Sequence, residues 1–345
     1  MQSNLARDTS ATPVAVDAMG GDFGVSVSVP AVRRALFLCP DLRVSLAGSG
    51  SGLASELRRC ALADDPRVTV VEADSEIESD SDPIDDLKHS SGTSMRAAVE
   101  LVRSGAASAC VSGGNTGALV AISRYLLRTI SGVEHPALAT CIPSIGNSAG
   151  RSVMLDLGAN LHSTERDLVE YARFGSLFAR HIIGIPEPNV KILNVGTELS
   201  KGRKEIRAAA EELSSDRSVR FTGFMEGSEL FSSDADVIVT DGFSGNIALK
   251  TAEGFARTLF KSHSGRSPIA KLMDLPLKWF LGRRLRIFSP DRYNGAALLG
   301  LSGIVVKSHG AAGTEAFANS ILAARDLVRS GIMPALIKST AEPSN

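Results

Sequence analysis

Short apolar runs alternate with amphipathic helical patterns along most of the chain. The runs are almost continuously apolar, which is typical of strands buried on both faces of a parallel sheet. The ten predicted strands are Val14–Ala18, Arg43–Ala47, Arg67–Glu72, Ala109–Ser112, Ala137–Ile142, Ser152–Leu157, Val190–Val195, Val219–Phe224, Asp236–Thr240 and Ile304–Lys307. Helical patterns between them include Thr93–Arg103, Thr116–Thr129, Glu165–His181, Lys201–Leu213 and Gly245–Lys261. This alternation predicts a three-layer α/β/α fold with a mainly parallel sheet.

The pattern predicts one catalytic domain over residues 13–333, with frayed tails at 1–12 and 334–345. A long uncharged stretch, Gly105–Ser123, has 19 residues. Its centre is polar, so it reads as strand, loop and helix and not as a membrane span. The first dozen residues have no apolar core of a secretory signal. We therefore expect a cytoplasmic protein.

One segment, residues 257–292, lacks the strand pattern, and we expect an inserted amphipathic helical arm there. Nine basic residues against two acidic ones give it a charge of +7. Such a composition favours contact with an anionic membrane surface or with an acidic partner. Packing on the core or on a second subunit is the alternative. The candidate contact residues are Leu277, Lys278, Phe280, Leu281, Arg283, Arg284 and Arg286.

The total charge of −1 argues against a dedicated nucleic-acid-binding protein. With the arm at +7, the rest of the chain carries −8. The four cysteines have no metal-ligand spacing, and we expect them to be buried apolar residues of a reducing compartment. The six histidines are scattered, so the sequence predicts no metal site.

Six of the predicted strands end in loops that mix glycine with Asn, Asp, Thr or Lys. Ligands of open α/β sheets bind at the carboxyl ends of strands, so we expect these loops to converge on one polar site. Glycines let backbone N–H groups approach an anion, and helix N-termini add a favourable dipole. The loops therefore favour a small phosphate-bearing ligand, with Lys201 and Lys250 supplying positive charge. Asp17 and Asp22 are expected to hold their glycine loop by accepting backbone N–H bonds, or to act as a general base.

The sequence does not match three common motifs for nucleotide binding and nucleophilic catalysis. No G-K-[ST] phosphate loop exists, and in Gly48–Gly52 the third glycine of a dinucleotide fingerprint falls on Leu53. No G-x-S-x-G nucleophile elbow occurs, and no cysteine lies in the strand-end loops. A covalent acyl-enzyme is therefore not expected.

Taken together, seven strings resemble the phosphate acyltransferase (PlsX) family of bacterial phospholipid synthesis. They occur in family order between Val14 and Ala324. They are AVDAMGGD (Ala15–Asp22), SSGTSMRAAVELV (Ser90–Val102), SGGNTGAL (Ser112–Leu119), LDLGAN (Leu155–Asn160), NVG…KG (Asn194–Gly202), TDGFSGNIALKTAEG (Thr240–Gly254) and YNGAALLGLSGIVVKSHG (Tyr293–Gly310). Departures are Gly114 for the family's alanine, Leu161-His162 for its Val-Asp, and Thr197-Glu198 for its double glutamate.

The resemblance implies transfer of a long-chain acyl group from acyl carrier protein to inorganic phosphate. It also implies a fold related to isocitrate and isopropylmalate dehydrogenases and to phosphotransacetylase, without a nicotinamide cofactor. A homodimer with peripheral membrane contact, near a downstream glycerol-phosphate acyltransferase, is the implied assembly. A non-catalytic membrane-bound scaffold and an NAD-dependent decarboxylating dehydrogenase are the alternatives.

Phosphate is itself a nucleophile, so such an enzyme must bind, align and desolvate it and stabilise the thioester oxyanion. His309 could donate a proton, or could only fix its loop. The candidate catalytic residues are Asn115, Asn160, Lys201, Asn246 and His309. The candidate substrate- and phosphate-binding residues are Asp17, Gly20, Gly21, Asp22, Ser94, Gly114, Thr116, Gly117, Asp156, Gly158, Asn194, Glu198, Asp241, Gly242, Gly245 and Lys250.

Overall fold

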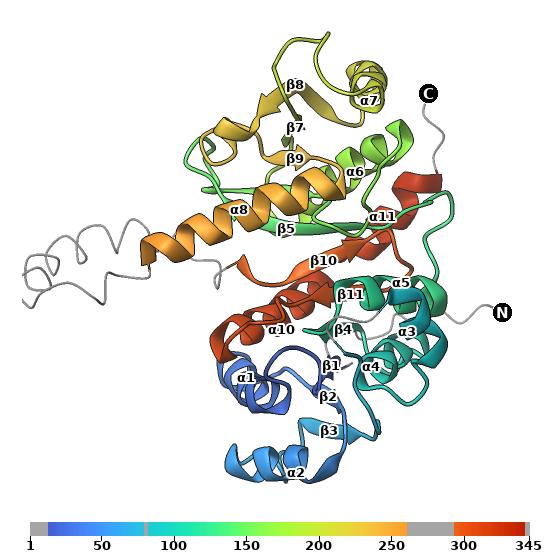
Figure 1. The fold of residues 1–345 in the computed structure, drawn as a ribbon, viewed down its shortest axis with the longest axis vertical. Helices are drawn as coiled ribbons and strands as arrows, with labels where there is room; N and C mark the ends of the chain where they lie inside the picture. Colours follow the sequence, from blue (N-terminus) through green and yellow to red (C-terminus); the bar gives the residue numbers. More distant parts are fainter. Residues whose placement is uncertain (1–12, 79–81, 261–292, 342–345) are drawn as a thin grey trace, which may run out of the picture.

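The computed structural model describes residues 13–78, 82–260 and 293–341. Its described part forms one sheet with strand order β3-β2-β1-β4-β11-β10-β5-β6-β9-β7-β8 (Figure 1). The strands are β1 Val14–Asp17, β2 Val44–Ala47, β3 Val68–Val71, β4 Ala109–Ser112, β5 Ala137–Pro143, β6 Arg151–Leu155, β7 Asn189–Asn194, β8 Arg220–Glu226, β9 Val237–Val239, β10 Ala296–Leu299 and β11 Ile304–Lys307. The α-helices are α1 Val25–Leu38, α2 Gly50–Arg59, α3 Pro83–His89, α4 Ser94–Arg103, α5 Thr116–Leu127, α6 Glu165–Phe178, α7 Lys204–Ser215, α8 Gly242–Phe260, α10 Thr314–Arg329 and α11 Ile332–Ala341. A π-helical turn, Ala179–Ile183, continues α6, and a 3-10 turn covers Gly227–Glu229.

Helices cover both faces of the sheet, which confirms the predicted α/β/α layers. Alternate residues of each strand join different clusters: Val14 and Val16 belong to the cluster that includes residues of α1, α6, α10 and α11, whereas Ala15 belongs to the cluster that includes residues of α4 and α5. Partly buried Ala248 and Leu249 place α8 on the α4 and α5 side. The ends of all ten predicted strands and all five predicted helices lie within three residues of the observed ones.

The strand directions divide the sheet into two halves. Strands β1, β2, β3, β4 and β11 are parallel to one another. Strand β10 is antiparallel to both of its neighbours, β11 and β5, and β5 is antiparallel to β6. Strands β6, β9, β7 and β8 are again parallel, but they run opposite to the first set. The carboxyl ends of the two sets therefore lie at opposite edges of the sheet.

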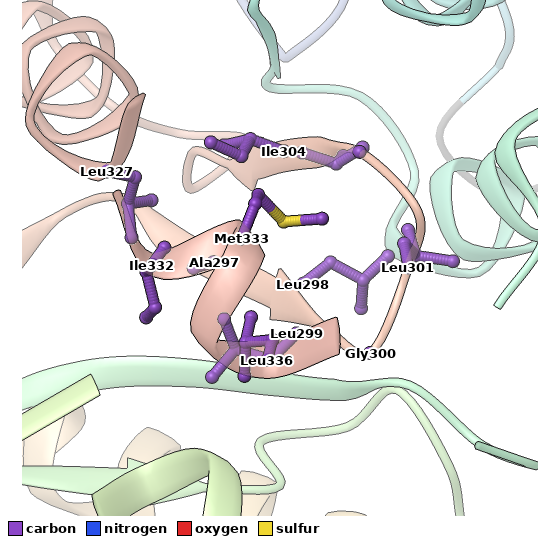
Figure 2. A pocket seen from close by; sticks show the side chains of 12 residues that line it. Ala297, Leu298, Leu299, Gly300, Leu301, Ile304, Leu327, Ile332, Met333 and Leu336 are labelled. Carbon is purple, nitrogen blue, oxygen red and sulfur yellow. The ribbon is translucent and has the colours of Figure 1, made fainter. Parts of the chain in front are cut away.

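The expectation of a frayed tail from Pro334 onward is wrong as far as Ala341. These residues belong to α11, whose Ile332 and Leu336 are buried. Together with α10, α11 encloses a small apolar cavity beside β10 and β11 (Figure 2). The cavity volume is about 10 Å³. That is the lower limit for one water molecule, so the cavity is too small for an acyl chain.

No helix of the described ranges is both long and apolar enough to cross a bilayer. The predicted contact residues of the basic arm lie outside the described residues. They are Leu277, Lys278, Phe280, Leu281, Arg283, Arg284 and Arg286. The arm therefore stays a prediction from the sequence.

Candidate active site

Asp17, the last residue of β1, is fully buried and connects three elements. Its Oδ1 accepts hydrogen bonds from the backbone N–H of Gly20 at 3.0 Å and from the hydroxyl of Ser94 at 2.6 Å. Its Oδ2 accepts from the hydroxyl of Ser112 at 2.6 Å. Because Ser94 begins α4 and Ser112 ends β4, the carboxylate fixes both elements to the loop after β1. Asp17 thus holds its glycine loop through the Gly20 N–H. A general-base role of Asp17 or Asp22 stays a prediction.

Glycines allow the loops after β1, β4 and β11 to touch through their backbones. A Cβ added to Gly113 would lie 3.2 Å from the Gly20 carbonyl oxygen, and one added to Gly21 would lie 3.2 Å from the Gly310 oxygen. The N–H of Asp22 also donates to Gly310 at 3.0 Å. We call these three loops, with Asp17, Ser94, Ser112 and Lys307, the Asp17 group.

Lys307 is the last residue of β11 and the buried cation of the Asp17 group. Its exposure is 9%, and its Nζ donates to the carbonyl oxygens of Gly113, at 3.3 Å, and Ser308. The pKa of Lys307 is lowered to about 8, chiefly by burial; the charges of Asp17 and Asp22 raise this pKa, and the positive charge of Lys250 on α8 lowers it.

His309 lies at the rim of the same group. Its ring Nδ1 accepts the backbone N–H of Ala311 at 3.1 Å, and the backbone N–H of His309 donates to Asn294 Oδ1 at 2.9 Å. Its Nε2 lies 3.8 Å from Glu253 Oε2, on α8. A ring whose Nδ1 is an acceptor carries its proton on Nε2 when it is neutral. The loop-fixing role is thus present, and a proton-donating role stays a prediction.

The N-terminus of α5 follows β4 directly. Asn115 caps it by accepting the N–H of Ala118 at 3.1 Å, and Thr116 is its first residue. A Cβ on Gly117 would lie 2.5 Å from Cγ of Pro83, so α3 packs closely there. The cap places the start of α5 next to Gly114, whose N–H donates to Ser112 Oγ at 3.1 Å.

A second set of polar residues surrounds Asp156, which follows β6 and is fully buried. Its carboxylate accepts the backbone N–H groups of Leu138, Gly158, Ala159 and Asn160 at 2.9–3.2 Å. Burial raises its pKa, and these hydrogen bonds work in the opposite direction.

Asn160 is held inside this second set. Its Nδ2 donates to Pro136 O at 2.7 Å, to Asp156 Oδ2 at 2.9 Å and to the Tyr171 hydroxyl at 3.0 Å. An amide NH₂ has two hydrogens, so both already have acceptors within the protein. This geometry gives Asn160 a loop-fixing position.

The N-terminus of α8 packs onto the Asp156 loop. A Cβ on Gly242 would lie 2.9 Å from Asp156 Oδ2, and one on Gly245 would overlap the Asp156 carbonyl oxygen. Half-buried Asn246 lies over Gly158, with its Nδ2 3.4 Å from the Cβ position there. Asp156, Gly158, Asn160, Asp241, Gly242, Gly245 and Asn246 form what we call the Asp156 group.

The loop after β7 joins the Asp156 group through an ion pair between Arg203 and buried Asp241. The Asp241 carboxylate also accepts the N–H of Ser244 at 2.9 Å. Asn194 Nδ2 donates to the Lys201 carbonyl oxygen at 3.2 Å, and the N–H of Lys201 donates to Glu198 O at 3.0 Å. These bonds close the loop that carries the exposed Lys201 and Glu198 side chains.

The predicted loops lie in two groups, because the antiparallel β10 and β5 reverse the direction of the second half of the sheet. That the two groups form one site stays a prediction. The Asp17 group lies at the ends of β1, β4 and β11, and the Asp156 group at the ends of β6 and β9. The two lysines expected to act together are also separated. Lys250 lies near Lys307, whereas Lys201 belongs to the β7 loop.

Helix α8 connects the two groups. It begins at Gly242 in the Asp156 group and reaches the Asp17 group at Lys250 and Glu253. Figure 1 shows it as the long orange helix that crosses the view. Candidate site residues from both groups therefore lie along one helix.

Sequence reasoning missed Lys307, Ser112 and Arg203. Lys307 had a usable signal, because a charged residue that ends the apolar run Ile304–Val306 requires a partner. Ser112 stands in the string Ser112–Leu119, but its bond to Asp17 could not be inferred, and Arg203 had no signal, since both partners, Asp17 and Asp241, are distant in the chain.

The described residues hold no cluster of His, Cys, Asp or Glu suited to a metal ion. All four cysteines are free thiols. Burial raises the pKa of Cys110, beside the Asp17 group, and raises that of Cys141 to about 11. Neither thiol is activated as a nucleophile.

A solved structure shares the fold of this chain, and curated relatives share its sequence. A phosphotransacetylase from Streptococcus pyogenes superimposes with a TM-score of 0.62 at 18% identity, covering 92% of this chain and 94% of that one. At this identity the likeness concerns the fold alone. Two curated relatives are named Phosphate acyltransferase. The one from Tolumonas auensis is 44% identical over 315 residues, covering 91% of this chain and 92% of the relative. The one from Aliivibrio salmonicida is 42% identical over 311 residues, covering 89% and 90%.

These similarities place the chain among the acyltransferases. The model of the family described as fatty acid synthesis protein matches residues 12–334. The chain belongs to this fatty acid synthesis protein family.

Proposed function

We propose that the chain transfers a long-chain acyl group from acyl carrier protein to inorganic phosphate, giving acyl phosphate and free carrier protein for phospholipid synthesis. The family match over residues 12–334 and the name of the curated relatives support phosphate as the acceptor. The long acyl chain, the carrier and the mechanism are our proposal.

The observation that carries this proposal is the contact between the glycine loops after β1, β4 and β11. Gly20, Gly21, Gly113 and Gly310 bring three backbones together at the carboxyl ends of parallel strands. Glycine loops at strand ends can bind oxyanions through backbone N–H groups, and the N-terminus of α5 adds its dipole beside Gly114. The Asp17 group is therefore our candidate phosphate site.

In the proposed reaction, a phosphate oxygen attacks the thioester carbonyl carbon, and the C–S bond breaks. The sulfur leaves as thiolate and takes up the proton that hydrogen phosphate loses, so the acyl phosphate and the free thiol balance the reactants. Asn246 and Asn115 are candidate donors to the carbonyl oxyanion, because both lie at helix N-termini beside the two groups. The raised pKa values of Cys110 and Cys141 agree with direct attack by phosphate.

The test is thiol release from acyl carrier protein thioester, followed with a thiol reagent, with phosphate and with sulfate as the matched anion. We expect release with phosphate and its absence with sulfate. Asn246→Ala is expected to lower kcat/KM by ~10²-fold, the scale for one oxyanion donor. Asn189→Ala, at the first residue of β7 and so at the opposite end of that strand from its polar loop, is the control. Thiol release that does not depend on phosphate at any acyl length would exclude the function. The alternative of a non-catalytic scaffold predicts that Asn246→Ala changes nothing.

We also propose a homodimer and peripheral membrane contact through the basic arm of residues 257–292. Carrier docking on the same arm is the alternative use of its charge. The combined change Leu277→Glu and Phe280→Glu tests this, since it places negative charge on the apolar pattern of the arm. We expect loss of liposome co-sedimentation with unchanged turnover in solution, and retained co-sedimentation would count against lipid contact. Sedimentation equilibrium measures the dimer.

A further inference from the structure

Lys307 is a charged residue in a position where the strand pattern calls for an apolar one. The other residues of β11, from Ile304 to Val306, are buried aliphatic side chains, and Lys307 is itself nine-tenths buried. Removing an ammonium from water is costly unless it is paired, so a buried lysine requires a specific reason.

The contacts of Lys307 tie two glycine loops together. Its Nζ donates to the carbonyl oxygens of Gly113 and Ser308, one in each loop. An ammonium carries three N–H bonds, so two are used by the protein and a third remains for another acceptor. That acceptor would lie where the loops after β4 and β11 meet.

A second cation approaches the same place from α8. Lys250 lies on α8 one turn before Glu253, whose Oε2 is 3.8 Å from Nε2 of His309 in the loop after β11, and its positive charge lowers the pKa of Lys307. Facing them, Asp17 on β1 and Asp22 in the loop after β1 supply negative charge. Asp17 already accepts three hydrogen bonds, from Gly20, Ser94 and Ser112. Two lysines held together beside glycine loops are the arrangement that an anion bound between them would stabilise.

We propose that Lys307 is a phosphate-binding residue, and that inorganic phosphate lies between Lys307 and Lys250 against the Gly113 and Ser308 loops. The phosphate accepts the third N–H of Lys307, which also fixes the position of the attacking oxygen. This proposal rests on the proposed function for the identity of the ligand, but phosphate binding can be measured without turnover.

Phosphate affinity should then depend on the protonation of Lys307. Burial lowers the pKa of Lys307 to about 8, so its ammonium is mostly present at about pH 7.5 and mostly lost at about pH 9.5. Inorganic phosphate is mainly a dianion throughout this range. If only the ammonium form binds, the affinity falls by about 20-fold between these two pH values.

The experiment is isothermal titration of the full chain with inorganic phosphate at about pH 7.5 and about pH 9.5, without carrier or thioester. Lys307→Met, Lys307→Arg and wild type are compared, with exposed Lys204→Met as the matched control. We expect wild type and control to lose about 20-fold in affinity at the higher pH. Lys307→Met should bind at least ~10-fold more weakly at the lower pH, the scale for one charge-assisted hydrogen bond. A folded Lys307→Arg should bind equally at both pH values, because guanidinium keeps its charge.

Unchanged phosphate affinity in folded Lys307→Met overturns the proposal. If that variant does not fold, a wild-type affinity that stays constant between the two pH values overturns it, whatever the variants do. Failure of the proposed function looks different. Phosphate would still bind in the Lys307-dependent way, but wild type would release no thiol from the carrier thioester.

Discussion

The contact between α8 and the Asp156 loop depends on the absence of a side chain at Gly245. A Cβ there would overlap the carbonyl oxygen of Asp156 and would lie 2.7 Å from Cγ2 of Thr240. The Asp156 oxygen is a backbone atom directly after β6, so it cannot rotate away. Gly245→Ala must therefore move the first turn of α8 away from β6.

The magnitude follows from two opposing effects. Overpacking of this kind costs ~1–3 kcal/mol, while replacing a helical glycine with alanine gains ~0.5–1 kcal/mol. We expect Gly245→Ala to lower the free energy of unfolding by about 1–2 kcal/mol. Gly254 lies on the same helix with no atom within 4 Å of its Cβ position, so Gly254→Ala should gain the helical contribution alone. The helical gain is common to both variants, so their free energies of unfolding should differ by the overpacking cost of about 1–3 kcal/mol.

Urea denaturation followed by circular dichroism measures both variants under the same conditions. Equal stabilities for Gly245→Ala and Gly254→Ala would refute the close approach of α8 to Asp156. A turnover assay adds a second readout, since displacement of Asn246 should lower kcat in Gly245→Ala and leave Gly254→Ala unchanged.

Three other substitutions test separate parts of the structure. Because the folded pKa of Lys307 is about 8 against 10.5 for free lysine, wild type should gain about 2–3 kcal/mol relative to Lys307→Met from about pH 7 to pH 10. If the difference in free energy of unfolding between wild type and Lys307→Met does not change with pH, the burial of the Lys307 ammonium is contradicted. Asn160→Ala should cost about 2–4 kcal/mol in the same assay, because Pro136, Asp156 and Tyr171 lose a donor; a neutral result would remove its loop-fixing position. Leu336→Ala should cost about 2–5 kcal/mol if α11 is packed, and nothing if the tail frays.

Local patterns predicted the layers of the fold, because apolar runs and helical periodicity are determined by neighbouring residues. They did not predict β10, whose sequence Ala-Ala-Leu-Leu lacks β-branched residues. Its only local signal is the pair of flanking glycines, Gly295 and Gly300, which have positive φ angles. With β10 absent, the reversal of strand direction between β11 and β6 could not be inferred.

The candidate site shows the same limit. The sequence identified the polar loops and the role of Asp17 as a holder of its glycine loop, since each follows from residues close in the chain. It could not divide them into the Asp17 and Asp156 groups, because this division depends on long-range pairing through β5 and β10. The placement of Lys250 with Lys307 likewise depends on how α8 crosses the sheet.

Helix α8 also fixes the spacing between residues of the two groups. Asn246, Lys250 and Glu253 are spaced at i, i+4 and i+7, so they share one face of the helix. With a rise of about 1.5 Å per residue, the asparagine and the lysine lie about 6 Å apart along the axis. The pitch of α8 would therefore set the separation of the bound carbonyl and the bound phosphate. Inserting or deleting one residue between Asn246 and Lys250 would turn the two side chains about 100° apart, and would separate their functions while preserving every side chain.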